Sequence, residues 1–258
     1  MNIYLTIGLV VFTYMVLWYG ISLVLKRNDV ADIAWGLGFV VVSWVSFFLS
    51  PQTERGLLVA VLVTLWGARL SFHIFLRNKN KPEDFRYRNW RESWMNFYLR
   101  SFLQVFMLQG LFLYIISFPI IFLQHHHVIG LAWVDLVGTG TWIIGFLFES
   151  ISDYQLKAFK SKSEHAGRIM TTGLWKYSRH PNYFGEVVQW WGIFLIALPL
   201  SGGWLTIVSP LTITYLIRYV SGVPMLERKY AGNAEFEQYK KRTSLLFPLP
   251  QSADFSID

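Results

Sequence analysis

Residues 3–25 read IYLTIGLVVFTYMVLWYGISLVL, a run that holds no charged side chain. A helix needs about 20 apolar residues to cross the hydrocarbon core of a bilayer, so this run predicts a membrane-spanning helix. No basic segment precedes the run and no small-residue cleavage site follows Lys26, which is unlike a secretory signal peptide. We therefore expect it to remain as the first helix of the protein.

Six further stretches of similar length and apolarity follow the first one. In a bilayer every backbone polar group needs a partner, and a helix supplies those partners within one segment. The sequence therefore predicts an all-α fold, a polytopic membrane bundle of about seven transmembrane helices that forms a single integral membrane domain over residues 1–258. The six stretches lie near residues 31–50, 56–76, 98–123, 130–150, 183–201 and 203–221.

The composition agrees with a membrane protein. The chain is 53% hydrophobic, 18% aromatic and 15% charged, whereas about 25% of the residues in a soluble domain are charged. This excludes a disordered chain and disfavours a soluble enzyme. The chain has no Cys, which excludes disulfides, thiolate metal sites and a thiol nucleophile. We interpret the triplet His125–His127, which has only Asp135 as a nearby acid, as a solvated turn, and we predict no metal site.

The basic residues predict the orientation. Of the 23 Lys and Arg residues, 20 lie in alternate connecting segments and in the C-terminal tail, within residues 26–27, 77–100, 157–179 and 228–242. By the positive-inside rule these segments are cytoplasmic, so the C-terminus is expected to be cytoplasmic and the N-terminus outside. The net charge of +7 then lies beside the membrane. It favours anionic lipid or an anionic cofactor, and not nucleic acid, as the partner.

Charge within or at the ends of a membrane span is costly, so charged residues at such positions are functional candidates. Asp32 is either a functional residue or the first-turn acid of its helix, favoured there by the helix dipole. Arg69 lies mid-helix and is expected to pair with a carboxylate or a ligand anion. Arg218 is either functional or extends its side chain to the cytoplasmic surface. The third loop, Lys81–Arg91, mixes charges with aromatic residues, as does a surface on the lipid headgroups, and it is also a candidate cover for a cofactor.

The densest polar group is in the C-terminal half. Glu149, Asp153 and Lys157 share one helical face because they are four residues apart, and alone they indicate an ion-paired helix end. Farther on, Arg179 and His180 precede Pro181, which suits the first turn of a helix.

Asn182 and Glu186 then lie one turn apart on that helix. The free N–H groups of its first turn, with the nearby Arg and His, suit a phosphate or carboxylate. We predict a ligand site within about residues 130–250.

Three segments of the chain, Gly173–Glu186, Ser152–Lys157 and Ser221–Glu227, are similar to the bacterial branch of the steroid 5-alpha-reductase-like membrane proteins. The resemblance implies a seven-helix bundle with cytoplasmic cofactor entry, as a multi-pass protein of the bacterial inner membrane. Part of the first segment, Arg-His-Pro-x-Tyr-x-Gly, is also similar to isoprenylcysteine and phospholipid methyltransferases, which bind S-adenosylmethionine.

The resemblance implies an oxidoreductase acting on CH–CH groups, an NADPH-dependent ene-reductase. Its substrate would be a steroid-like or other lipid, in which it reduces a carbon–carbon double bond conjugated to a carbonyl. Some positions match the cofactor-binding residues of the family directly, and Lys160 falls where the steroid enzymes carry an Arg near the phosphates. The predicted cofactor-binding set is Asp153, Lys160, Arg179, His180, Asn182, Tyr183, Glu186 and Arg218.

The catalytic residues depart from the family pattern. The steroid reductases polarise the ketone with a Glu on helix two and a Tyr on helix three, and the counterparts here are Asp32 and Trp66. Because an indole cannot act as that acid, either Asp32 works with another donor, Tyr87 being one candidate, or the substrate is not a steroid enone. The alternatives to a reductase are an S-adenosylmethionine-dependent lipid or isoprenylcysteine-type methyltransferase and a non-catalytic lipid-binding protein.

Overall fold

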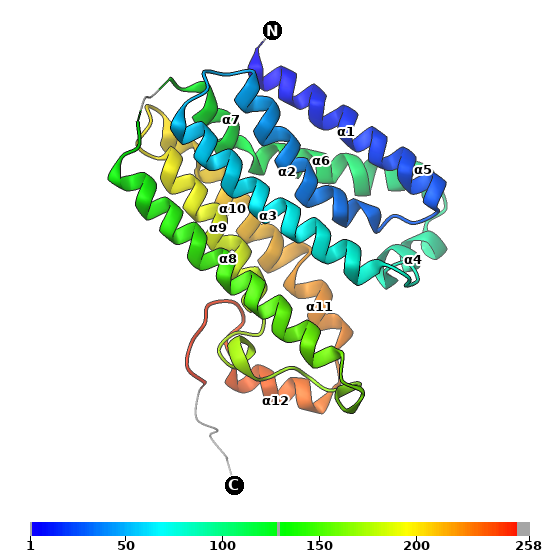
Figure 1. Cartoon of the computed structure of the whole chain (residues 1–258). Helices are drawn as coiled ribbons and strands as arrows, with labels where there is room; N and C mark the ends of the chain where they lie inside the picture. Colours follow the sequence, from blue (N-terminus) through cyan, green and yellow to red (C-terminus); the bar gives the residue numbers. More distant parts are fainter. Residues whose placement is uncertain (1, 128–129, 252–258) are drawn as a thin grey trace. The chain divides into compact units, whose positions relative to one another are not determined.

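The computed structural model describes residues 2–127 and 130–251, and these residues form helices and connecting loops with no strand among them (Figure 1). The all-α prediction is therefore confirmed. The α-helices are α1 (Ile3–Leu25), α2 (Val30–Phe48), α3 (Glu54–Asn78), α4 (Phe85–Ser93), α5 (Phe97–Arg100), α6 (Leu108–Ile116), α7 (Phe118–His125), α8 (Trp133–Lys160), α9 (Pro181–Ala197), α10 (Val208–Tyr215), α11 (Val223–Lys229) and α12 (Ala234–Arg242).

Five helical segments of the described chain are long and apolar enough to cross a membrane: α1, α2, α3, Phe97–Ile116 and α8. They confirm a multi-span membrane protein. The two remaining predicted spans look different, since α9 has 17 residues and the segment after it is divided among η4 (Gly203–Ile207), α10 and η5 (Leu216–Val220). The count of seven and the orientation of the termini stay predictions.

The predicted span over residues 98–123 is wrong as a single helix. The helix ends at Ile116, Ser117 separates it from α7, and Pro119 lies in the first turn of α7. Proline lacks a backbone N–H and its ring clashes with the preceding turn, so a straight helix cannot continue through it. Before the break, a π-helical stretch, η1 (Ser101–Met107), joins α5 to α6.

The chain forms two compact units, one of Met1–Asp135 with Ala197–Ser209 and the other of Leu136–Ile196 with Pro210–Asp258. In the first unit α2 and α3 pack with their backbones in contact. A Cβ at Gly36 would lie 2.6 Å from the carbonyl oxygen of Gly67, and a Cβ at Gly67 would lie 2.5 Å from that of Gly36. No side chain fits between these helices at this level, so the contact fixes their spacing close to the N-terminal end of α2.

In the second unit α8 and α9 approach each other in the same way. A Cβ at Gly145 would lie 2.5 Å from the carbonyl oxygen of Gly185, and a Cβ at Gly192 would lie 2.7 Å from that of Gly138. Because the earlier glycine of α8 meets the later one of α9, the two helices are antiparallel. Polar side chains farther along the same faces are thereby placed opposite each other.

A buried ion pair links the starts of α3 and α8. Arg55 Nε lies 2.8 Å from Asp135 Oδ1, and Asp135 also accepts a hydrogen bond from the Ala132 N–H. Both charged residues are at most 5% exposed. Burying charges requires close pairing of this kind, so Arg55 has a structural partner at the end of the bundle opposite Asp32.

Candidate functional site

Asp32 lies in the first turn of α2, and side chains from α4 donate hydrogen bonds to both of its carboxylate oxygens. The Tyr87 hydroxyl donates to Oδ1 at 2.6 Å, and Arg86 Nη2 donates to Oδ2 at 2.7 Å. Arg77, in the last turn of α3, lies 3.9 Å from Oδ2. The structure thus brings the two predicted catalytic side chains into direct contact, although 55 residues separate them in the chain.

A second layer of charged groups holds Arg86 in place. Its Nε donates to Asp84 Oδ1 at 2.9 Å, and the Asp84 N–H donates to Asp29 Oδ2 at 3.1 Å. Asp29, which is 1% exposed, also accepts two hydrogen bonds of 2.6 Å from the guanidinium of Arg27. A continuous chain of ion pairs and one backbone hydrogen bond therefore runs from the α1–α2 turn to the carboxylate of Asp32.

The segment before α4 is fixed to the same turn by Glu83. Its carboxylate accepts from the Asn28 N–H at 2.5 Å and from Arg91 at 3.1 Å. Asn28 in turn donates to Ser101 Oγ at 2.8 Å. Figure 1 shows α4 beside the α1–α2 turn and the end of α3. The predicted ordered third loop is thus a cover over Asp32, and its alternating charges were the sequence signal for these partners.

Burial and charge set the acidity of the groups in this cluster. Burial raises the pKa of Tyr87 well above its usual range, the charge of Asp32 raises it further, and the charge of Arg86 opposes both. Burial also pushes the pKa of Asp84 upward, but its hydrogen bond and charge interaction with Arg86 outweigh burial and hold that pKa below its usual value. Arg86 therefore influences the electrostatics of both neighbours.

In the second unit, predicted cofactor-binding residues of α8 and α9 meet. Asn182 Nδ2 donates to Asp153 Oδ1 at 3.2 Å. Two turns farther along α9, Gln189 Nε2 donates to Glu149 Oε2 at 2.7 Å, and both of these side chains are buried. The close packing of the α8 and α9 glycines brings these pairs within hydrogen-bond distance. The paired groups provide amide and carboxylate functions side by side on neighbouring helices.

Arg179 and His180 share a partner that the sequence analysis did not single out. Glu227, on α11, accepts from Arg179 Nε at 2.9 Å and lies 3.2 Å from His180 Nε2. Because an ionised carboxylate only accepts hydrogen bonds, Nε2 carries the proton in this pair. Glu227 ends the segment Ser221–Glu227 that carried part of the family resemblance, which was the signal that could have found it.

The cluster around Glu227 is mostly buried, which affects its titration. Burial lowers the pKa of His180, outweighing the opposing hydrogen bond and charge of Glu227. Burial would raise the pKa of Glu227, but the hydrogen bond from His180 and the charge of Arg179 hold it below its usual value. The arrangement favours a neutral His180 beside an ionised Glu227.

The C-terminal segment runs along the same loop. Arg179 Nη1 donates to the carbonyl oxygens of Lys240 and Thr243, at the C-terminal end of α12, and Ser178 Oγ donates to that of Leu246 at 2.8 Å. A cation at a helix C-terminus satisfies carbonyls that lack helical partners. Arg179 thus donates hydrogen bonds from both Nε and Nη1 to other groups of the protein, and these bonds hold the end of α12 and the residue after it.

The other predicted cofactor-binding residues lie on three elements of this unit. The Tyr183 ring stacks on His180, with centroids 5.5 Å apart, and Glu186 follows Asn182 by one turn on α9. Lys160 is the last residue of α8. Arg218 lies in η5 with its guanidinium 5.1 Å from the centroid of the Tyr219 ring.

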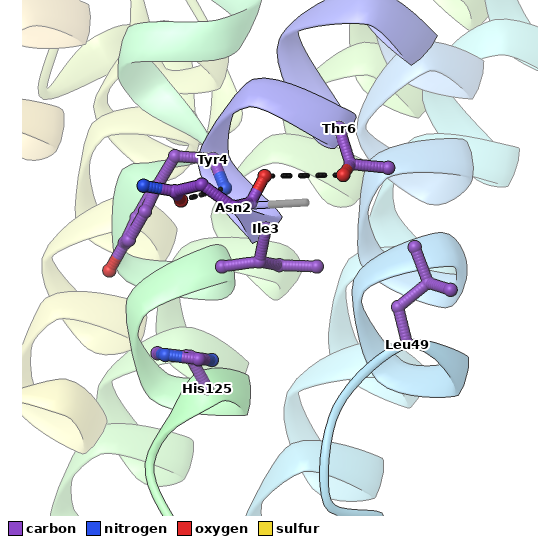
Figure 2. Close-up of a pocket in the computed structure, with 6 residues that line it drawn as sticks. All are labelled: Asn2, Ile3, Tyr4, Thr6, Leu49 and His125. Carbon is purple, nitrogen blue, oxygen red and sulfur yellow. Dashed lines mark hydrogen bonds between the residues drawn. The ribbon is translucent and has the colours of Figure 1, made fainter.

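An open depression lies at the N-terminal end of α1 (Figure 2). Two of its polar groups serve the helix end, because Asn2 Oδ1 accepts from the Tyr4 N–H at 3.0 Å and Thr6 Oγ1 donates to the Asn2 carbonyl. The depression also includes Leu49, which directly follows the C-terminal end of α2, whereas Asp32 lies at the N-terminal end of that helix. None of the predicted site residues lines it, and its lining is Asn2, Ile3, Tyr4, Thr6, Leu49 and His125.

Comparisons with known proteins show similarity to dehydrogenases and to a methyltransferase. 3-oxo-5-alpha-steroid 4-dehydrogenase 1 of Bos taurus is 37% identical over 67 residues, 26% of this chain and 26% of the relative. The enzyme of the same name from Macaca fascicularis is 27% identical over 131 residues, 49% of this chain and 47% of the relative. Methanethiol S-methyltransferase 1 of Bradyrhizobium diazoefficiens is 32% identical over 123 residues, 46% and 40% of the two chains.

The chain spans less than half the length of each of these curated relatives, and no solved structure matches it. A family model described as "Protein of unknown function (DUF1295)" matches residues 18–243. Since this match covers most of the sequence, the chain belongs to the DUF1295 family.

Proposed function

We propose that this protein is a membrane reductase that uses NADPH to reduce a carbon–carbon double bond conjugated to a carbonyl in a lipid-like substrate. The observation that carries the proposal is the hydrogen bond between the Tyr87 hydroxyl and Asp32, beside the guanidinium of Arg86. A hydrogen-bond donor is needed to polarise a ketone oxygen, and the phenol of Tyr87 is such a donor, held in place by the carboxylate. The similarity to two 3-oxo-5-alpha-steroid 4-dehydrogenases supports this type of reaction.

The position of Tyr87 accounts for the missing tyrosine on the third helix. Trp66 is 2% exposed, and its ring packs edge-on against Phe39 with centroids 5.4 Å apart, so it serves as a core residue. The phenol comes instead from α4, which lies over the start of α2. In the proposal Tyr87 takes the part of the absent tyrosine.

The chemistry of an enone reduction explains why these groups are needed. When hydride adds to the β carbon, the electrons of the double bond move onto the carbonyl oxygen, and the resulting enolate then takes a proton at the α carbon. A donor aimed at that oxygen stabilises the charge as it develops. In the proposal Asp32 holds the Tyr87 hydroxyl in place before the substrate binds, and Tyr87 then donates to the substrate oxygen.

The residues of the second unit suit the cofactor. The Asp153–Asn182 pair offers acceptors and donors for hydroxyl and carboxamide groups, and Lys160 and Arg218 offer positive charge for phosphates. When bound, NADPH supplies the hydride for the reduction. Glu186 belongs to the same proposed set, and the surrounding Lys and Arg residues favour the 2′-phosphate of NADPH over NADH.

A binding titration tests the cofactor. Detergent-purified protein is titrated with NADPH, NADH and S-adenosylmethionine, and we expect saturable binding of NADPH. Saturable binding of S-adenosylmethionine alone would overturn the reductase. Turnover is measured as NADPH oxidation in the presence of a 3-oxo-4-ene steroid, a probe chosen from the activity named for the relatives.

The same titration resolves the alternatives. A methyltransferase is favoured by the similarity to methanethiol S-methyltransferase 1, and it would use the same second-unit residues for S-adenosylmethionine. Binding of none of the three compounds would favour a non-catalytic lipid-binding protein. For each function the expected partners are membrane lipids and a lipid-like ligand, and the expected location is the bacterial inner membrane.

Glu186→Gln tests the placement of the cofactor site. We predict weaker NADPH binding because the amide leaves one acceptor oxygen where the carboxylate offers two for the hydroxyl and carboxamide donors of the cofactor. The control is Glu164→Gln, whose side chain is 70% exposed and lies in a loop of the same unit. Unchanged NADPH affinity in a folded Glu186→Gln protein would show that the cofactor binds elsewhere.

A further inference from the structure

Arg86 contacts both members of the proposed catalytic pair. Its Nη2 donates to Asp32 Oδ2 at 2.7 Å, and its guanidinium carbon lies 5.3 Å from the centroid of the Tyr87 ring. These contacts use the oxygen of Asp32 that Tyr87 leaves free, so the two bonds together fix the rotation of the carboxylate. Without Arg86, the plane of the carboxylate could rotate away from the Tyr87 hydroxyl.

The position of Arg86 is itself fixed from behind. Its Nε is bound by Asp84, whose backbone N–H is bound by Asp29. The Arg86 side chain is 23% exposed, so little of it is free to move into solvent. Functional groups keep their geometry when the residues behind them are locked by packing and hydrogen bonds. The ion pair of Arg86 with Asp84 and the backbone hydrogen bond from Asp84 to Asp29 hold Arg86 in this way.

We propose that Arg86 is a positioning residue, which orients Asp32 toward Tyr87 and balances its charge when Tyr87 turns to the substrate. Tyr87 has one hydroxyl hydrogen, which it donates to Asp32 in this structure. To donate to a substrate carbonyl it must give up that bond, and Asp32 then keeps its hydrogen bond to Arg86 and the more distant charge of Arg77. This inference rests on the proposed function for the substrate and on the observed contacts for the orienting role.

The activity test is a comparison of Arg86→Gln, Arg86→Lys and Arg88→Gln. For Arg86→Gln we expect kcat for a 3-oxo-4-ene steroid to fall about 10- to 100-fold, the range typical for loss of a supporting residue, while NADPH affinity is unchanged. Arg86→Lys restores part of kcat because it keeps the charge. Arg88→Gln is the matched control, since Arg88 is exposed and lies on the same helix, and we expect it to act as wild type.

A double-mutant cycle separates positioning from general stability. In an Asp32→Asn background, Arg86→Gln is expected to cause little further loss of kcat, because its effect passes through Asp32. Independent losses that multiply would overturn the proposal, as would wild-type kcat in Arg86→Gln. Residues that act on one another give such non-additive effects.

A measurement without substrate distinguishes this proposal from the proposed function. The coupling between Asp32→Asn and Tyr87→Phe is measured from thermal unfolding, in the wild-type background and in Arg86→Gln. We expect the coupling to fall toward zero in Arg86→Gln, because the carboxylate is no longer held toward the phenol. If the coupling in the Arg86→Gln background is unchanged, the positioning role is overturned, whether or not the wild type reduces the steroid. If the coupling is lost but the wild type is inactive, only the proposed reductase is overturned.

Discussion

At the residue scale, the carboxylate of Asp32 is the central group of the first unit. It sits where a membrane helix begins, and it is bound by a phenol and a guanidinium from α4. Asp32→Asn keeps the shape of the side chain but places an amide where one of these donors now binds. We predict that kcat falls about 10- to 100-fold, the range typical for loss of a supporting residue, because Asp32 then holds Tyr87 less well.

The Asp32→Asn prediction is checked by steady-state turnover together with NADPH titration. Cofactor affinity should stay at the wild-type value, because the proposed cofactor residues belong to the other unit. Glu92→Gln, a neutralised carboxylate at an exposed position of α4, serves as the control. Full activity of Asp32→Asn would remove this residue from the mechanism.

The cluster of His180 and Glu227 predicts a pH-dependent stability. The pKa of His180 is lowered from its ordinary 6.5, so below that pH the unfolded chain takes up a proton that the folded protein does not. The pKa of Glu227 is lowered from 4.5, so the same holds for it below 4.5. Both groups therefore stabilise the protein at higher pH, and their contribution is lost as the pH falls.

We predict that the unfolding temperature in detergent falls between about pH 7 and about pH 5, the window in which His180 acts. His180→Gln should make this fall smaller, since it removes the titrating group. His127→Gln, an exposed histidine of the other unit, should leave the fall unchanged. An equal pH dependence in His180→Gln and wild type would contradict the assignment.

At the element scale, backbone contact between α8 and α9 sets the spacing of the proposed cofactor residues. Gly145→Ala places a methyl group 2.5 Å from the Gly185 carbonyl oxygen, so the helices must move apart. We predict a loss of about 1–3 kcal/mol in stability, the usual cost of overpacking. NADPH binding should weaken as well, because the Asp153–Asn182 pair is separated.

Gly140→Ala is the matched control for this prediction, and thermal unfolding is the measurement. Gly140 lies on the same helix and nothing is within 4 Å of a Cβ there. Alanine is the better helix former by about 1 kcal/mol, so this change should be neutral or stabilising. If both alanine variants behaved alike, the close contact of α8 with α9 would not be important for stability.

The helices also differ in how well the sequence predicts them. The length of the apolar stretches correctly predicted α1, α2, α3 and α8, because the ability of a segment to span a membrane depends on its local composition. It also predicted the span Phe97–Ile116 within the stretch 98–123, but it missed the end of that helix, because the apolar run continues past the break at Ser117 into α7. The charge at the end of a predicted span indicated Asp32, and the departure from the family pattern indicated Tyr87. The contact of Glu227 with Arg179 depends on how distant elements pack, and the periodicity of a sequence does not contain that information.

At the scale of the whole molecule, the distribution of charge predicts the orientation in the membrane. Translocating Lys and Arg across a bilayer is unfavourable, so loops rich in them remain cytoplasmic. The loop after α8 is such a segment, whereas the loop before α8 contains no Lys or Arg. The loop before α8 should therefore face outward and the loop after it should face the cytoplasm.

The absence of native Cys makes this orientation directly measurable, because any single cysteine introduced is a unique label site. Leu131→Cys lies before α8 at a position 54% exposed, and Lys162→Cys lies after it at a side chain 61% exposed. We predict that a membrane-impermeant maleimide labels Leu131→Cys in intact cells and Lys162→Cys only after permeabilisation. The reverse pattern would invert the orientation, and it would place the proposed cofactor residues near the end of α8 on the side of the membrane that lacks cytoplasmic NADPH.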